Sequence, residues 1–255
     1  RVDRNGVVRR TARAKQFVPP TEPEAPQPGS PEDLAQREAV ARAVMESDEW
    51  KAATAAPAFD TSKVPGYLSE EWKANRRYVR PDGSVIGDYY DALNYLMDQA
   101  YAAVPGGVAN ERKLYIVMGY PGAGKSTIIN SLRAQKRAAH IVADDAKVII
   151  PEYDGGRNSG GVHEESSDIA STLTAMALST GDNIIIEKLG SSENSITKWI
   201  RAAKSEGYTV TLINVDVPKA IAMERAVARY RRTGRAVPLS VYDDLRITDL
   251  YNIIN

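Results

Sequence analysis

Short apolar runs alternate with longer amphipathic segments throughout the second half of the chain. The runs are rich in Ile and Val and have few polar positions, which is typical of strands buried on both faces of a sheet. The predicted strands span residues 114–118, 140–144, 183–187 and 209–215. Between them, apolar residues at helical spacing predict helices over 126–137, 165–179, 195–205 and from Pro218 onward, with a glycine-rich loop at 154–161. This alternation predicts an α/β fold with a parallel sheet and helices on both faces.

The segment before the predicted sheet has the pattern of a helical extension. Ser30 is a good N-cap residue and Pro31 stands at the first helical position, which predicts a helix that ends near Ala53. Residues 88–104 carry a single apolar stripe at helical spacing, so we expect that helix to pack on the core of the α/β domain. A short helix over 69–76 and a tight turn over 80–84 are expected between these two helices.

The chain therefore divides into three predicted parts. Residues 1–30 combine a basic patch with five prolines between Val18 and Ser30, which predicts an arm with little fixed structure. Residues 31–107 form the helical extension, and Pro105-Gly-Gly107 separates it from the α/β domain of residues 108–255.

Composition narrows the function classes. The 33 basic and 33 acidic residues cancel, so no global positive field recruits nucleic acid, and we do not expect nucleic acid as a partner. The absence of cysteine excludes disulfides, thiolate metal sites and a cysteine nucleophile, and it fits a reducing, cytoplasmic compartment. No apolar run approaches the roughly 20 residues of a membrane span, so we expect no membrane partner.

A phosphate-binding pattern, G-x-x-x-x-G-K-[ST], lies directly after the first predicted strand and opens the first predicted helix. Backbone N–H groups of such a loop close around phosphate oxygens, and the helix N-terminus favours negative charge. We expect Lys125 to contact the β- and γ-phosphates and the Ser126 hydroxyl to bind Mg²⁺. The sequence therefore predicts a P-loop NTPase fold that binds ATP (or GTP) with Mg²⁺. The predicted nucleotide-binding residues are Gly119, Pro121, Gly122, Ala123, Gly124, Lys125, Ser126 and Thr127.

Two aspartates at the end of the second predicted strand favour a kinase within this class. Ligands of parallel sheets bind beyond the carboxyl ends of the strands, and a kinase needs a carboxylate there to accept the proton of the acceptor hydroxyl. Asp144 and Asp145 occupy this position, although either could instead cap the following helix. Neither an Asp-x-x-Gly nor an Asn-Lys-x-Asp motif follows the loop, which argues against a GTPase.

Over residues 113–238 the chain resembles the zeta toxin family. The matching motifs, in order, are residues 119–127, 144–151, 162–166, 185–187 and 229–238. The resemblance implies a kinase that transfers phosphate from ATP to the sugar 3′-hydroxyl of UDP-N-acetylglucosamine. It also implies an antitoxin partner, a small helical protein whose helix obstructs the nucleotide site.

The resemblance assigns roles to individual residues. Asp144 aligns with the catalytic base, with Asp145 as the alternative, and Glu187 aligns with the carboxylate that holds the acceptor. Arg229 and Arg235 align with the arginines that clamp the ATP phosphates, a role that suits the bidentate guanidinium group. The sequence departs from the family pattern at Lys188-Leu-Gly190, where many members carry Gly-Thr. This change alters the floor of the acceptor site.

Two further residues of the 162–166 motif could contact the acceptor. His163 is expected to touch the acceptor or to make a structural hydrogen bond, and a role as base is less favoured. Glu165 could position the acceptor, or it could only place a favourable negative charge at a helix N-terminus.

Three functions stay open from the sequence. The first is a Mg-ATP-dependent small-molecule kinase acting on UDP-N-acetylglucosamine, and the second keeps the mechanism but acts on a dinucleotide, an antibiotic or a polynucleotide end. The third is a scaffold or interaction module that binds ATP only as a structural ligand. The helical extension could act as an intramolecular inhibitory helix, as a partner surface or as a plain extension of the fold.

Overall fold

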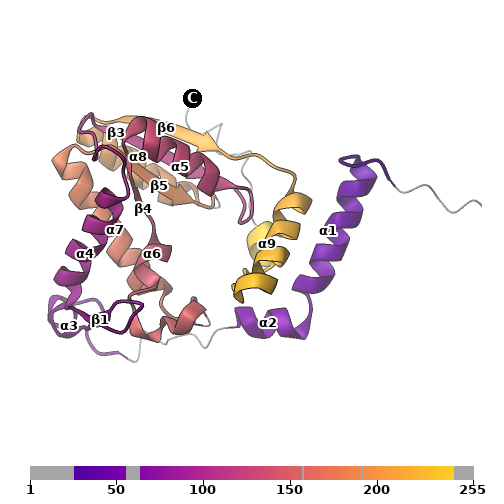
Figure 1. Ribbon diagram of the computed structural model, residues 1–255, viewed down its shortest axis with the longest axis horizontal. Helices are drawn as coiled ribbons and strands as arrows, with labels where there is room; N and C mark the ends of the chain where they lie inside the picture. The colour runs from indigo at the N-terminus through magenta and orange to yellow at the C-terminus, as the bar shows by residue number, and fades with distance from the viewer. Residues whose placement is uncertain (1–25, 56–63, 157, 191, 244–255) are drawn as a thin grey trace, which may run out of the picture.

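The computed structural model describes residues 26–55, 64–156, 158–190 and 192–243. Its centre is a parallel sheet of four strands, β3 (Lys113–Met118), β4 (Ala139–Ile141), β5 (Ile184–Lys188) and β6 (Thr209–Asn214). The strand order is β4-β5-β3-β6, so the strand before the P-loop is central and pairs with β5 and β6 (Figure 1). This architecture confirms the predicted α/β fold with a parallel sheet.

Helices cover both faces of the sheet because alternate strand residues point to opposite sides. On one face, Leu114 and Ile116 are fully buried in a core shared with α4 (Tyr89–Ala102), α7 (His163–Thr180) and α8 (Glu193–Ser205). On the other face, Tyr115 and Val117 pack with Ile129 of α5 (Lys125–Lys136). The apolar stripe predicted for residues 88–104 is therefore the side of α4 that enters the main core.

A second, smaller core holds the N-terminal helices against the C-terminal part of the described chain. There α1 (Pro31–Met45) and α2 (Asp48–Thr54) lie beside α9 (Lys219–Thr233), as Figure 1 shows at its right-hand side. The buried residues of this cluster include Met45, Trp50, Met223 and, from α10 (Ser240–Asp243), Tyr242. Exposed ion pairs border it, among them Arg37 with Glu224 and Lys219 with Glu38.

The single helix predicted from Pro31 to Ala53 is wrong, because the chain breaks it after Met45. Ser47 has an extended backbone, and its side chain accepts a hydrogen bond from the N–H of Trp50, so it caps a new helix. The break turns α2 away from the axis of α1 and brings Trp50 into the second core, where only 1% of its surface is exposed.

The rest of the extension packs elsewhere. Helix α3 (Glu70–Asn75) is followed by a hairpin, β1 (Tyr78–Val79) and β2 (Val85–Gly87), whose connection is the predicted turn. Asp88 then caps α4 with a reciprocal capping box. Whereas α1 and α2 pack on α9, α3 and α4 pack on the opposite side of the molecule near α7 (Figure 1). The extension is thus divided between two distant surfaces.

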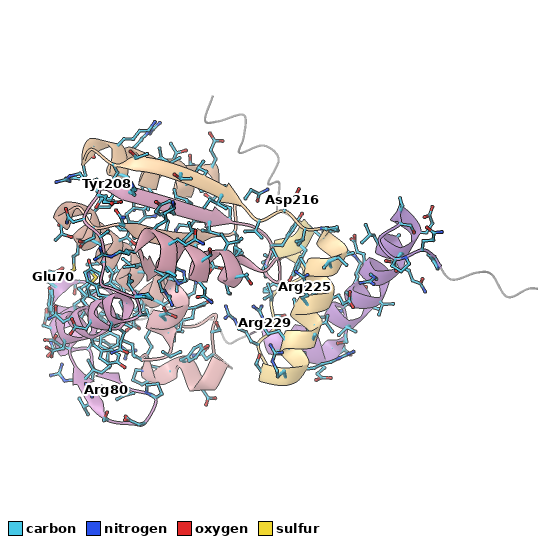
Figure 2. The ribbon with its side chains drawn as sticks, turned by 45° about the horizontal axis from the view of Figure 1, so that its top comes forward. Glu70, Arg80, Tyr208, Asp216, Arg225 and Arg229 are labelled. Atoms are coloured by element: carbon cyan, nitrogen blue, oxygen red, sulfur yellow. The ribbon has the colours of Figure 1, made fainter. Side chains whose placement is uncertain are left out.

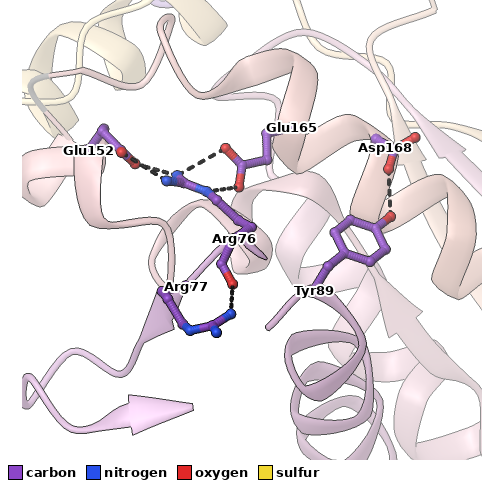
Figure 3. A network of polar contacts seen from close by, with 6 residues as sticks. All are labelled: Arg76, Arg77, Tyr89, Glu152, Glu165 and Asp168. Atoms are coloured by element: carbon purple, nitrogen blue, oxygen red, sulfur yellow. Dashed lines mark hydrogen bonds and ion pairs between the residues drawn. The ribbon is translucent and has the colours of Figure 1, made fainter. Parts of the chain in front are cut away.

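A polar network ties α3 and α4 to α7. Arg76 donates from Nε to Glu165 Oε1 at 2.8 Å and from Nη1 to Glu152 Oε1 at 2.9 Å. Beside it, the Tyr89 hydroxyl donates to Asp168 at 2.5 Å (Figure 3). Because Arg76 is mostly buried between the two glutamates, this network fixes the start of α7 against the extension.

The second predicted strand, 140–144, is shorter in the structure. β4 ends at Ile141, and residues Ala143–Lys147 form the short helix α6. Its first turn contains Asp144 and Asp145, whose negative charges are favourable at a helix N-terminus. The glycine-rich loop predicted at 154–161 overlaps a 3₁₀ segment, η2 (Pro151–Gly156).

Of the predicted arm, residues 1–25 lie outside the described residues. Among the helices that the structure describes, none combines the length and apolar character needed to cross a membrane.

Candidate active site

A cavity of about 800 Å³ lies where β3, β4 and β5 end. Its walls come from the P-loop, α6, the first turns of α7, the start of α8, and the C-terminal end of α9 with the loop after it. The site thus lies at the carboxyl ends of parallel strands, as expected for this class of sheet. Figure 2 shows Arg225 and Arg229 on the side of α9 that faces the rest of the α/β domain.

The P-loop has the backbone shape that its glycines permit. Gly122 has φ +87°, and a Cβ added there would lie 2.3 Å from the carbonyl oxygen of Ala222, so only glycine fits. Gly124, at φ +97°, begins α5 in the left-handed region. Of the residues predicted to bind nucleotide, Gly119, Ala123 and Thr127 do not line the cavity. Those that line it are Pro121, Gly122, Gly124, Lys125 and Ser126.

Lys125 is buried at the base of the P-loop, with 6% of its surface exposed. Its Nζ donates to the carbonyl oxygens of Gly119 at 2.8 Å and Tyr120 at 3.0 Å, and lies 3.4 Å from Glu187 Oε1. Burial lowers the pKa of Lys125, and the Glu187 carboxylate opposes that shift. The ammonium group is therefore held at the floor of the cavity by the end of β5.

Asp144 is the carboxylate that faces the cavity from α6. It pairs with Arg235 of the loop after α9, and its Oδ1 lies 3.2 Å from Nζ of Lys147. Burial by itself would raise the pKa of Asp144, but the charges of Arg235 and Lys147 outweigh it, so the pKa lies below its ordinary value. Asp144 is consequently ionised at neutral pH.

Lys147 was part of the 144–151 motif but was not predicted to belong to the site. It is buried, lines the cavity, and donates from Nζ to the Ser159 hydroxyl at 3.1 Å. The sequence feature that could have identified Lys147 is its spacing of three residues from Asp144, which places both side chains on one face of a helix.

The two arginines that line the cavity are Arg229 and Arg235. Burial lowers the pKa of Arg229 from its ordinary value, and the nearby positive charge of Arg235 lowers it further. The buried Nε of Arg229 has no hydrogen-bond partner within the described part of the chain. Two guanidinium groups that repel each other in a cavity form a suitable receptor for a polyanion such as a triphosphate.

Two predicted site residues do not line the cavity, Glu165 as an acceptor contact and Asp145 as the alternative base. Glu165 has 3% of its surface exposed and is bound to Arg76 instead, so its role in the structure is to join α7 to the extension. Asp145 points to the other side of α6, where it lines a separate cavity of about 220 Å³ together with Arg133 and His140.

Many polar side chains besides those of the P-loop line the cavity. His163 and Glu187, which are predicted to contact the acceptor, are among them, and so are two lysines that were not predicted as site residues, Lys188 and Lys198. Burial lowers the pKa of Lys188, and the charge of Lys198 lowers it further. Trp199 adds an apolar wall, and the hydroxyl groups that line the cavity outside the P-loop are those of Ser167, Ser171, Thr174, Ser192 and Ser195.

The residues around the P-loop fit a magnesium ion that a nucleotide brings with it. Mg²⁺ in such sites takes one or two protein oxygens and completes its shell with phosphates and water. The exposed Ser126 hydroxyl lines the cavity and could supply one of these oxygens. Across the described residues there is no group of three or more acidic or histidine side chains that would hold a metal without a nucleotide.

His140 beside this site makes the stability of the fold depend on pH. Burial and then the charge of Arg133 lower its pKa to about 4, against about 6.5 in the unfolded chain. Between these pH values the unfolded state binds more protons, so the free energy of unfolding falls by about 3 kcal/mol as the pH drops from 6.5 to 4.

His140→Gln should remove that part of the pH dependence of the free energy of unfolding, measured by urea unfolding at pH 7 and pH 4.5. Equal pH dependence in both proteins would contradict the assignment.

The fold and the site define a P-loop NTPase: a central strand, a glycine-rich loop, a buried lysine and a serine at the start of a helix, opposite two arginines. The family model of the zeta toxins matches residues 107–248, more than half of the chain. The chain belongs to the zeta toxin family, and this membership supports a P-loop kinase. No curated protein matches the sequence at a significant level.

Solved structures with a similar fold have low sequence identity. One, from the PezAT chromosomal toxin–antitoxin system of Streptococcus pneumoniae, is 20% identical with a TM-score of 0.48, and the match covers 55% of this chain and 62% of that one. Another, from the Pnkp1/Rnl/Hen1 RNA repair complex, is 22% identical with a TM-score of 0.43, covering 56% and 45%. A putative kinase from Chloroflexus aurantiacus is 19% identical with a TM-score of 0.43, covering 53% and 77%. The chain thus spans less than two thirds of the first two of these chains.

Proposed function

We propose that this protein is a Mg-ATP-dependent kinase that transfers the γ-phosphate to a hydroxyl group of a small molecule, with UDP-N-acetylglucosamine as the first acceptor to test. The observation that carries the proposal is the ionised Asp144 carboxylate in the same cavity as Lys125 of the P-loop. A site that only holds ATP needs Lys125, whereas phosphoryl transfer to a hydroxyl group also needs a carboxylate that accepts the proton of that hydroxyl.

Each group has a distinct task in this reaction. The P-loop amides and Lys125 bind the β- and γ-phosphates, while Arg229 and Arg235 neutralise the charge that spreads over the γ-phosphate oxygens. Mg²⁺, held with Ser126, would add positive charge between the same phosphates. The acceptor oxygen forms a bond to the γ-phosphorus, the bond from that phosphorus to the bridging oxygen breaks, and ADP leaves. Asp144 takes the proton of the acceptor hydroxyl.

The polar lining of the cavity outside the P-loop supports an acceptor with several hydroxyl groups. Glu187 can accept hydrogen bonds from a sugar, and the nearby serine and threonine hydroxyls can both donate and accept. Lys188 and Lys198 favour an acceptor that also carries negative charge, as a sugar nucleotide does. The position of Lys188 departs from the family pattern, so the acceptor must be established by experiment.

The test measures ATP turnover as a function of acceptor. With Mg-ATP and UDP-N-acetylglucosamine we expect ADP release and a phosphorylated sugar nucleotide, identified by mass spectrometry and ³¹P NMR. A metabolite extract with γ-labelled ATP is the parallel arm. A labelled product other than phosphorylated UDP-N-acetylglucosamine would change the acceptor but keep the kinase. ATP binding without turnover in either arm would favour the scaffold function.

We propose that a separate antitoxin chain, rather than the N-terminal helices, controls this activity in the reducing environment of the cytoplasm. Among the described residues, none of α1, α2, α3 or α4 lines the cavity. In this structure α1 and α2 cover the outer side of α9 and leave the nucleotide site open. The helices are thus not placed as an intramolecular inhibitor.

A further inference from the structure

Trp50 connects the N-terminal helices to the loop that carries Arg235. Its Nε1 donates a hydrogen bond to the carbonyl oxygen of Val237 at 3.0 Å, although the two residues are 187 positions apart. Its ring lies against Tyr230 of α9, with ring centroids 4.6 Å apart. The Trp50 side chain is buried, and the hydrogen bond itself is partly buried.

The loop after α9 is short and has two attachments on opposite sides. Gly234 ends α9 in the left-handed conformation, and directly after it the Arg235 side chain pairs with Asp144. Two residues further, Val237 lines the cavity and accepts the hydrogen bond from Trp50. Ala236 and Leu239 pack against the same buried cluster as Trp50. The backbone on either side of Arg235 is therefore held by α9 and by α2.

The same cluster reaches the P-loop. The hydroxyl group of Tyr242 donates to the carbonyl oxygen of Pro121 at 2.9 Å, and its ring stacks on Tyr120 at a centroid distance of 5.8 Å. Arg42 of α1 in turn donates to Asp243 at 2.7 Å. Helices α1 and α2 thus support the loop with Arg235 and, through α10, the phosphate-binding loop.

We propose that Trp50 is a positioning residue for phosphoryl transfer, which fixes Arg235 over the γ-phosphate side of the cavity through its hydrogen bond to Val237. This inference rests on the proposed kinase function. It assigns a role in the reaction to a helix outside the family match, which begins at residue 107. A guanidinium group contributes most to a transition state when it is fixed in place beforehand.

Trp50→Phe keeps an aromatic ring and removes the N–H donor. We expect kcat to fall by roughly 5- to 100-fold, because a displacement of about 1 Å in a positioned group can cost as much as about 10²-fold in rate, while the Kd of Mg-ATP changes by less than about twofold. Trp72→Phe in α3 is the matched control, and its kcat should equal that of the wild type. If Trp50→Phe does not fold, replacing Trp50 with benzothienylalanine removes the same N–H with almost no change in shape.

A double-mutant cycle separates positioning from general stabilisation. In an Arg235→Ala background, Trp50→Phe should cause little further loss of kcat, because Trp50 affects the reaction only by positioning Arg235. Additive losses, or an unchanged kcat in the single variant, would overturn the inference.

Hydrogen exchange gives a readout that does not depend on the kinase function. Amide exchange of residues 234–237 should be faster in Trp50→Phe than in Trp72→Phe, without acceptor present. Unchanged exchange overturns the positioning role even if the protein is a kinase. If exchange is faster but the protein phosphorylates no acceptor, the structural contact between Trp50 and Val237 is supported. The proposed kinase function is then refuted, and so is the role of Trp50 in phosphoryl transfer.

Discussion

Lys125→Ala is expected to reduce kcat/KM for phosphoryl transfer by at least roughly 10²- to 10³-fold, the usual effect of removing one preorganised group that stabilises transition-state charge. The Lys125 ammonium is buried and held by the Gly119 and Tyr120 carbonyls, so no neighbouring cation can replace it in that position. The measurement is acceptor-dependent ADP release at saturating acceptor, together with Mg-ATP binding by calorimetry.

The control for Lys125 is Lys136→Ala at the exposed end of the same helix. It removes the same charge from the protein without touching the cavity, and it should leave kcat/KM unchanged. A circular dichroism spectrum and a thermal transition should show that both variants fold. A folded Lys125→Ala protein with near wild-type turnover would refute the proposed nucleotide site.

Asp144→Asn is expected to lower kcat by roughly 10²- to 10⁴-fold with little change in the affinity for ATP, because the amide keeps the shape but cannot accept a proton. The ion pairs with Arg235 and Lys147 hold Asp144 in its ionised form. The wild-type carboxylate can therefore accept a proton at neutral pH, and the Asn variant loses this ability. Single-turnover rates with pre-bound Mg-ATP separate the chemical step from nucleotide binding.

Asp145→Asn is the matched control for the base. Asp145 follows Asp144 directly but lines the smaller cavity on the other side of α6, so its variant should keep the wild-type rate. A normal rate in Asp144→Asn combined with a large loss in Asp145→Asn would move the role by one residue. Normal rates in both variants would mean that no carboxylate of α6 is the base.

Arg235 links the proposed base to the proposed phosphate clamp. One guanidinium group has five N–H donors, so Arg235 can pair with Asp144 and still present other donors to the cavity. Since its charge also lowers the pKa of Asp144, the position of Arg235 sets how readily the carboxylate accepts a proton. A residue that supports this loop, such as Trp50, would therefore affect both phosphate binding by Arg235 and proton acceptance by Asp144.

The sequence alone was sufficient for the features that depend on neighbours in the chain. A strand, a glycine loop and a helix start follow one another without interruption, which fixes Lys125 and Ser126 at the helix N-terminus. The capping residue Ser30 likewise predicts the start of its helix, because a cap bonds to N–H groups two or three residues ahead. The alternation of strands and helices then determined the α/β class.

Only the tertiary structure decided which distant groups meet. Glu165 has the residue type and the motif position of an acceptor contact, yet Arg76, 89 positions away, takes it as a partner. The break after Met45 has a local signal in the cap Ser47, but the place of Trp50 against Tyr230 and Val237 comes from the tertiary structure. No local pattern encodes such contacts, because their free energy comes from burying surfaces that the sequence brings together only through the complete fold. Sequence determined the phosphate-binding loop, and packing decided which helices hold the arginine opposite to it.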